Sequence, residues 1–139
     1  MKELKLKYYK QLSLFLALIF AAVGLVFLIL PKGVLTFFNT IGRRLGMAQA
    51  PEVGFNFYLV LAVAYMYLVT LLAWMMARHP LNKIFHFLLA NAKLASSILS
   101  FGLFVFHQPY LIYITNGIVD GLIGAIVLCF FFKIRAASQ

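Results

Sequence analysis

The sequence predicts an all-α integral membrane protein, an antiparallel up-down four-helix bundle with a short interfacial amphipathic helix between the first and second spans. Of its 139 residues, 65% are hydrophobic, whereas about 45 to 50% is usual for soluble domains. Four apolar runs are each long enough to cross a hydrocarbon core of about 30 Å as a helix. Short links containing proline or glycine separate these runs. We therefore expect a single membrane domain over residues 1–139.

The four predicted membrane spans cover residues 12–30, 55–77, 84–106 and 110–132. The first follows four lysines and is longer than the apolar core of a cleavable signal, so we expect it to remain as a transmembrane helix. One of its faces carries small residues, which would allow another helix to approach closely. These residues are Ser13, Ala17, Ala21 and Gly24.

Residues 33–45 are too short to span the membrane but are strongly amphipathic. Apolar residues such as Val34, Phe37 and Ile41 recur at helical spacing, and polar residues including Arg43 and Arg44 lie opposite them. This pattern is typical of a helix that lies against the lipid headgroups. A lid over the mouth of the bundle, carried by the two arginines, is the alternative interpretation.

The distribution of basic residues predicts the orientation and the location. With a cytoplasmic N-terminus, eight lysines and arginines lie inside and three lie outside, namely Lys32, Arg43 and Arg44. The positive-inside rule then places both termini in the cytoplasm and makes the chain a multi-pass protein of the inner (plasma) membrane. Loop positions thus account for the net charge of +9. The lipid bilayer is the expected partner, and nucleic acid is not.

Two ionisable residues lie inside the predicted spans, Lys93 in the third and Asp120 in the fourth. Lys93 lies about 14 Å from the inner edge and Asp120 about 14 Å from the outer edge, so the two depths nearly coincide. A charged group at this depth is costly and usually pairs with another group. We therefore expect an ion pair, a neutral pair with shifted pKa values, or two groups separated by water or a ligand. The helical faces around the pair also present Asn116, Ser97, Ser100, His86 and Tyr113.

This polar interior has two interpretations. It is either a cavity that holds a small lipophilic or cationic molecule or relays protons, or a device that only fixes the register of the helices. The length of the polar face on the third span favours the cavity. The candidate ligand or proton site then comprises Lys93, Asp120, Asn116, Ser97, Ser100, His86 and Tyr113.

Other chemistry is less favoured. The single cysteine, Cys129, excludes an internal disulfide and a CxxC pair. The histidines lie at different depths without acidic partners, so no metal site is assigned and no cofactor is identified. We assign no catalytic residue, because the chain carries no nucleophile motif or phosphate-binding loop. Proton transfer on a lipophilic substrate remains compatible with the polar groups, but the sequence does not favour an enzyme.

Four close-set spans, a basic N-terminus, the link Arg78, His79, Pro80, and the polar segments AKLASS and NGIVDG characterise the chain. In outline it resembles the DoxX-like group of small bacterial four-helix membrane proteins. The resemblance is architectural and implies an inner-membrane bundle that works beside redox or export partners. It transfers no functional residue.

The leading functional hypothesis is a ligand-binding or proton-relaying membrane protein. Two alternatives stay open. The chain could be a non-catalytic accessory or assembly subunit of a larger membrane complex, contacting its partner through the small residues of the first span and a phenylalanine-rich face toward lipid. It could also be a small proton-coupled exporter that works as a homodimer.

Overall fold

The computed structural model describes residues 2–54 and 56–137, which form five helices. Residue 55, at which the second span is predicted to begin, lies outside the described residues. The helices are α1 (Lys2–Ile29), α2 (Pro31–Arg44), α3 (Asn56–Arg78), α4 (Lys83–Phe106) and α5 (Leu111–Ala137). All except α2 are long and apolar enough to cross a membrane, which indicates a multi-pass membrane protein. An all-helical chain with four such helices is confirmed.

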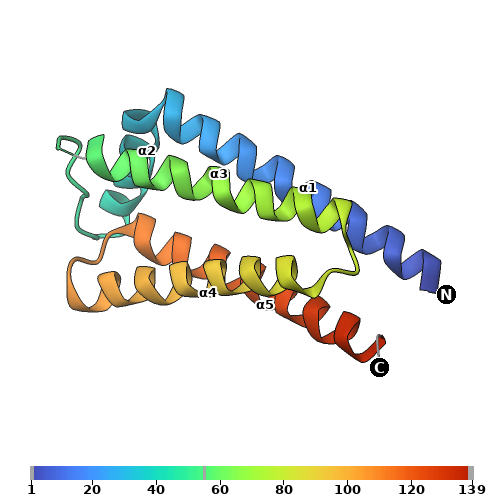
Figure 1. Ribbon diagram of the computed structural model, residues 1–139. Helices are drawn as coiled ribbons and strands as arrows, with labels where there is room; N and C mark the ends of the chain where they lie inside the picture. Colours follow the sequence, from blue (N-terminus) through green and yellow to red (C-terminus); the bar gives the residue numbers. More distant parts are fainter. Residues whose placement is uncertain (1, 55, 138–139) are drawn as a thin grey trace.

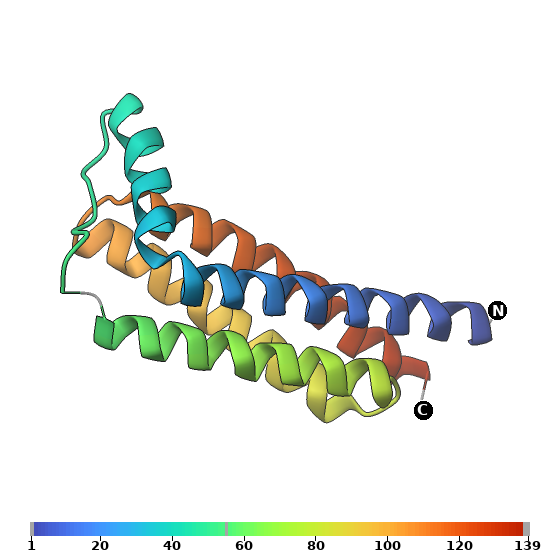
Figure 2. The same ribbon diagram turned by 90° about the horizontal axis from the view of Figure 1, so that it is seen from above.

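The four long helices form two packed pairs (Figure 1). α1 lies along α3 and α4 lies along α5, and contacts between α3 and α4 join the two pairs. Both termini lie at one end of the bundle, whereas α2 turns across the opposite end (Figure 2). Apolar residues of all four long helices meet in a common core, among them Phe20, Val69, Leu89 and Val127.

Local sequence explains where the helices begin and end. Pro31 occupies the first turn of α2, where a missing N–H is tolerated, and only Leu30 separates this helix from α1. Asn82 caps α4, because its side-chain oxygen accepts a hydrogen bond of 3.1 Å from the backbone N–H of Ile84. Pro80 lies in the preceding turn. α1 begins ten residues before the predicted span and includes the lysine-rich start of the chain.

Small residues set the distances between paired helices. Ser13, Ala17 and Gly24 are buried, as expected for the small-residue face of α1. A Cβ atom on Gly24 would lie 3.1 Å from the Cβ of Met66 in α3, so this face packs against α3. Between α4 and α5 the fit is closer. A Cβ on Gly124 would lie 2.9 Å from side-chain atoms of Leu94.

Thr36 donates a hydrogen bond of 3.3 Å to Glu52, and the chief link between α2 and the segment after it is Asn39. Its amide exchanges two hydrogen bonds of 2.8 Å with the backbone of Ala50 and donates a third, of 3.2 Å, to Glu52. An isolated β-bridge joins Ala48 to Tyr110, immediately before α5. α2 and the segment that follows it are therefore attached to the beginning of α5.

We expect Gly124→Ala to destabilise the bundle by about 1–3 kcal/mol, the usual cost of overpacking a close contact. The added methyl group would also lie 3.2 Å from the backbone nitrogen of Leu94, which cannot move away freely. Gly102→Ala in α4 is the matched control, because a Cβ there has open space within 4 Å. Thermal unfolding in detergent compares the two. Equal stability of the two variants would contradict close packing at Gly124.

Candidate functional site

The predicted contact between Lys93 and Asp120 is present. The Lys93 Nζ atom lies 2.8 Å from Asp120 Oδ1, and the two side chains are only 3% and 5% exposed. The ammonium group also lies over the rings of Phe20, at 4.4 Å from the centroid, and Tyr65, at 5.2 Å. Residues from α1, α3, α4 and α5 thus meet at this charge. Aromatic faces stabilise a cation that has lost its water.

Further hydrogen bonds join α4 to α5 on the side of the ion pair nearer to α2. Ser97 Oγ donates a bond of 2.6 Å to the backbone oxygen of Gly117. The Asn116 amide donates bonds of 2.8 Å to Ser100 Oγ and 3.2 Å to Ser96 Oγ. We call these contacts and the ion pair the α4–α5 polar clasp. It consists of Lys93, Ser96, Ser97, Ser100, Asn116, Gly117 and Asp120.

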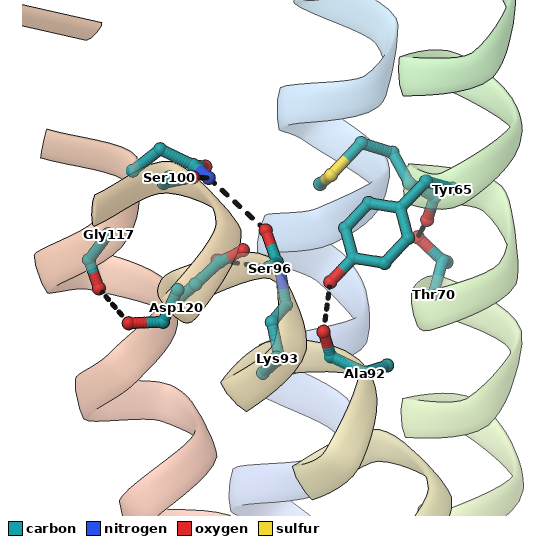
Figure 3. Close-up of polar contacts among 11 residues, drawn as sticks. Tyr65, Thr70, Ala92, Lys93, Ser96, Ser100, Gly117 and Asp120 are labelled. Carbon is teal, nitrogen blue, oxygen red and sulfur yellow. Dashed lines mark hydrogen bonds and ion pairs between the residues drawn. The ribbon is translucent and has the colours of Figure 1, made fainter. Parts of the chain in front are cut away.

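Tyr65 is a member of this region that the candidate site did not include. Its hydroxyl donates a hydrogen bond of 3.0 Å to the backbone oxygen of Ala92, and its ring contacts Lys93 (Figure 3). The sequence offered one indication of this role: a tyrosine hydroxyl near the middle of a membrane span needs a hydrogen-bond partner inside the protein. Tyr67 also lies near the middle of the span, but it is 70% exposed. The rotation of α3 about its axis therefore turns Tyr65, and not Tyr67, toward Lys93.

Two of the candidate residues lie away from the ion pair along their helices. His86 is fully buried about two turns from Lys93, and its Nδ1 lies 3.1 Å from the backbone oxygen of Asn82. Tyr113 is half-buried about two turns from Asp120, and its ring packs on Tyr110 at 5.3 Å. The structure therefore groups five of the seven candidate residues in the clasp and places these two outside it.

Two buried polar atoms lack a hydrogen-bond partner within residues 2–54 and 56–137. They are Asp120 Oδ2 and His86 Nε2. Because buried polar groups are nearly always satisfied, each such atom calls for an explanation, such as a bound water, a proton or a ligand. Asp120 thus pairs one carboxylate oxygen with Lys93, and its second, buried oxygen has no hydrogen-bond partner among the described residues.

A cavity of about 610 Å³ lies beside the clasp, between α1, α2 and α5. Val23 lies about one turn beyond Phe20, and Asn116 and Val119 lie within one turn of Asp120. A second cavity of about 280 Å³ lies between α1 and α3. Neither of these two is lined by Lys93 or Asp120. The larger cavity therefore adjoins the ion pair and is not centred on it.

The contribution of α2 differs from the lid hypothesis. Its apolar residues Val34, Phe37 and Phe38 form one wall of the larger cavity. Arg43 and Arg44 are exposed and do not line it, and Arg43 lies 3.4 Å from the side-chain oxygen of Gln49. The buried side of α2 carries Asn39 and Gly42, and the two arginines lie outside it.

Within the described residues, no group of three histidine, cysteine, aspartate or glutamate side chains could hold a metal ion. No family model matches the chain, and comparisons with curated proteins and with solved structures find no match either. The resemblance to DoxX-like proteins therefore stays a prediction.

We expect Lys93→Met to cost about 3–5 kcal/mol of stability, because it leaves the Asp120 carboxylate buried without its counter-charge. In the double variant Lys93→Met, Asp120→Asn, most of this loss should be recovered, since no uncompensated charge remains. Unfolding in mixed detergents measures both. A double variant as unstable as the single one would show that the ion pair is not the source of the loss.

Proposed function

We propose that this chain is an inner-membrane protein whose polar interior, centred on Lys93 and Asp120, binds a small lipophilic or cationic molecule or relays protons. The observation that carries the proposal is the second oxygen of Asp120, which is buried without a partner within residues 2–54 and 56–137 while the first pairs with Lys93. A pair that served helix register alone would gain from a donor at this oxygen. A site that accepts a proton or a ligand donor needs the oxygen to be available.

The surroundings of the pair suit an exchange of this kind. Lys93 is held by aromatic faces as well as by Asp120, so it keeps some stabilisation when the carboxylate takes a proton or another cation. Ion pairing and proton transfer within the pair both avoid an isolated charge inside a membrane. Ser97, Ser100 and Asn116 extend the polar path toward the cavity, and Tyr113 lies farther along α5 in the same direction. His86 lies two turns from Lys93 on the opposite side, toward the termini.

We further propose an antiparallel up-down arrangement across the inner membrane with both termini in the cytoplasm. Two observations support this orientation. The termini lie at one end of the bundle, and the side that they share carries eight basic residues against three on the other. α2 would then lie at the outer interface with Arg43 and Arg44 toward the headgroups. A DoxX-like role beside redox or export partners belongs to the same proposal.

The alternative of an accessory subunit keeps one of its two expected contact surfaces, the apolar side chains that would face lipid. The small-residue face of α1 is used within the chain, against α3. A partner protein would instead meet exposed apolar side chains of α1, such as Leu18 and Leu25. Co-purification with a stoichiometric partner in mild detergent would favour that alternative. Substrate-driven proton flux in liposomes would favour the dimeric exporter.

We expect Asp120→Asn to insert and to lose binding or proton flux. Because it leaves the Lys93 ammonium buried without a counter-charge, it should also lose stability, so the double variant Lys93→Met, Asp120→Asn, which leaves no unpaired charge, is measured beside it and should lose the same activity. The carboxamide keeps the size of the side chain but removes its charge and its capacity to take up a proton. Photolabelling with a neutral long-chain alcohol and with a lipophilic phosphonium cation measures binding, and pyranine-loaded liposomes measure proton flux.

Asn91→Leu is the matched control, because Asn91 is exposed and its amide bonds only to Phe87 of its own helix in the contacts described. A folded Asp120→Asn protein with the same labelling and flux as this control would contradict the proposal.

A further inference from the structure

The size and the lining of the cavity between α1, α2 and α5 favour an uncharged, mainly apolar ligand. Its volume of about 610 Å³ falls within the range of small-molecule sites, about 300 to 1,000 Å³. None of the described residues that line it is charged, and its polar members are Thr115 and Asn116. A ligand with a charged head would therefore lose its hydration without a counter-charge in return.

The cavity is accessible from the side of the bundle. Several of its lining residues are themselves exposed, including Val26, Leu30 and Phe37. In a membrane these side chains would face lipid. A lipophilic molecule could thus enter laterally from the bilayer and keep its apolar part between α1 and α2.

Asn116 determines which polar group the ligand should carry. Both of its described hydrogen bonds use the amide nitrogen, which donates to Ser96 and Ser100. These bonds orient the side chain and leave the amide oxygen Oδ1 as the acceptor for a ligand. A ligand that bonds to this oxygen must offer an O–H or N–H donor.

We infer that this cavity binds an uncharged lipophilic alcohol or phenol, with its apolar body between α1, α2 and α5 and its hydroxyl donating to Asn116 Oδ1. The inference rests on the proposed function and specifies it, because it selects a neutral ligand over a cationic one. It also places the ligand beside the ion pair. The hydroxyl end would lie one turn from Asp120, whose second oxygen has no hydrogen-bond partner among the described residues.

The test uses two photoreactive probes on the full-length protein in liposomes. They are hexadecanol with a mid-chain diazirine and its methyl ether, which has the same apolar body but no donor. We expect the alcohol to label residues 23–38 and 112–119 about fivefold more strongly than the ether, the ratio that one net hydrogen bond provides. Mass spectrometry of the labelled peptides locates the sites.

Two variants examine the cavity in different ways. Gly33→Leu fills it from α2 without touching the polar clasp, and should reduce labelling by the alcohol in these segments. The matched control is Gly102→Leu in α4, where a Cβ has open space within 4 Å and which does not line the cavity. Asn116→Leu should bring labelling by the alcohol down to that of the ether. Circular dichroism and gel filtration confirm that each variant is folded.

Equal labelling by the two probes in the unmodified protein would overturn the inference, since the cavity would then take any acyl chain of the bilayer. Labelling that is insensitive to Gly33→Leu would also overturn it. Asp120→Asn tests the proposed function independently of the cavity. If Asp120→Asn leaves selective labelling intact, the cavity site stands and the role of the ion pair fails. If Asp120→Asn abolishes binding that Gly33→Leu and Asn116→Leu do not affect, the reverse holds.

Discussion

The buried ion pair between Lys93 and Asp120 is the interaction on which the rest of this bundle depends. An ammonium group at mid-membrane depth is stable only with a counter-charge and a polarisable surround. The structure provides both, with a carboxylate from α5 at 2.8 Å and aromatic rings from α1 and α3. One charge thereby specifies how four helices are rotated relative to one another, because each must turn a particular residue toward it.

The close approach of α4 and α5 follows from this requirement. Asp120 lies between Gly117 and Gly124, two positions at which a side chain would collide with Phe101 or Leu94. Gly121 makes room for Ser97, since a Cβ there would lie 2.8 Å from the Ser97 Oγ that bonds to the backbone oxygen of Gly117. The same close approach brings Asn116 to two serines. The polar clasp and the glycines are thus one feature, since hydrogen bonds of this length require the backbones to be near each other.

The two halves of the bundle differ in what they leave open. Toward the termini, Leu89, Ala90 and Val127 are fully buried in the core. Toward α2, the long helices leave space that α2 closes only in part, with its apolar side against the cavity and its arginines facing outward. The lining of this cavity combines apolar side chains with the polar side chains of Thr115 and Asn116, and Asp120 lies outside it. This combination is typical of sites for small lipophilic molecules.

The sequence by itself determined the four membrane-length helices, the amphipathic segment after the first span and the matching depths of Lys93 and Asp120. These features follow from run lengths, from periodicity and from the cost of unpaired charge in a membrane. Only the tertiary structure decided that Tyr65 and not Tyr67 contacts Lys93, and that Ser97 bonds to a backbone oxygen. It alone placed the cavity beside the ion pair, with His86 and Tyr113 outside the clasp. The physical reason is that helix rotation and pairing arise from side-chain packing between segments far apart in the chain, which the pattern within one segment does not contain.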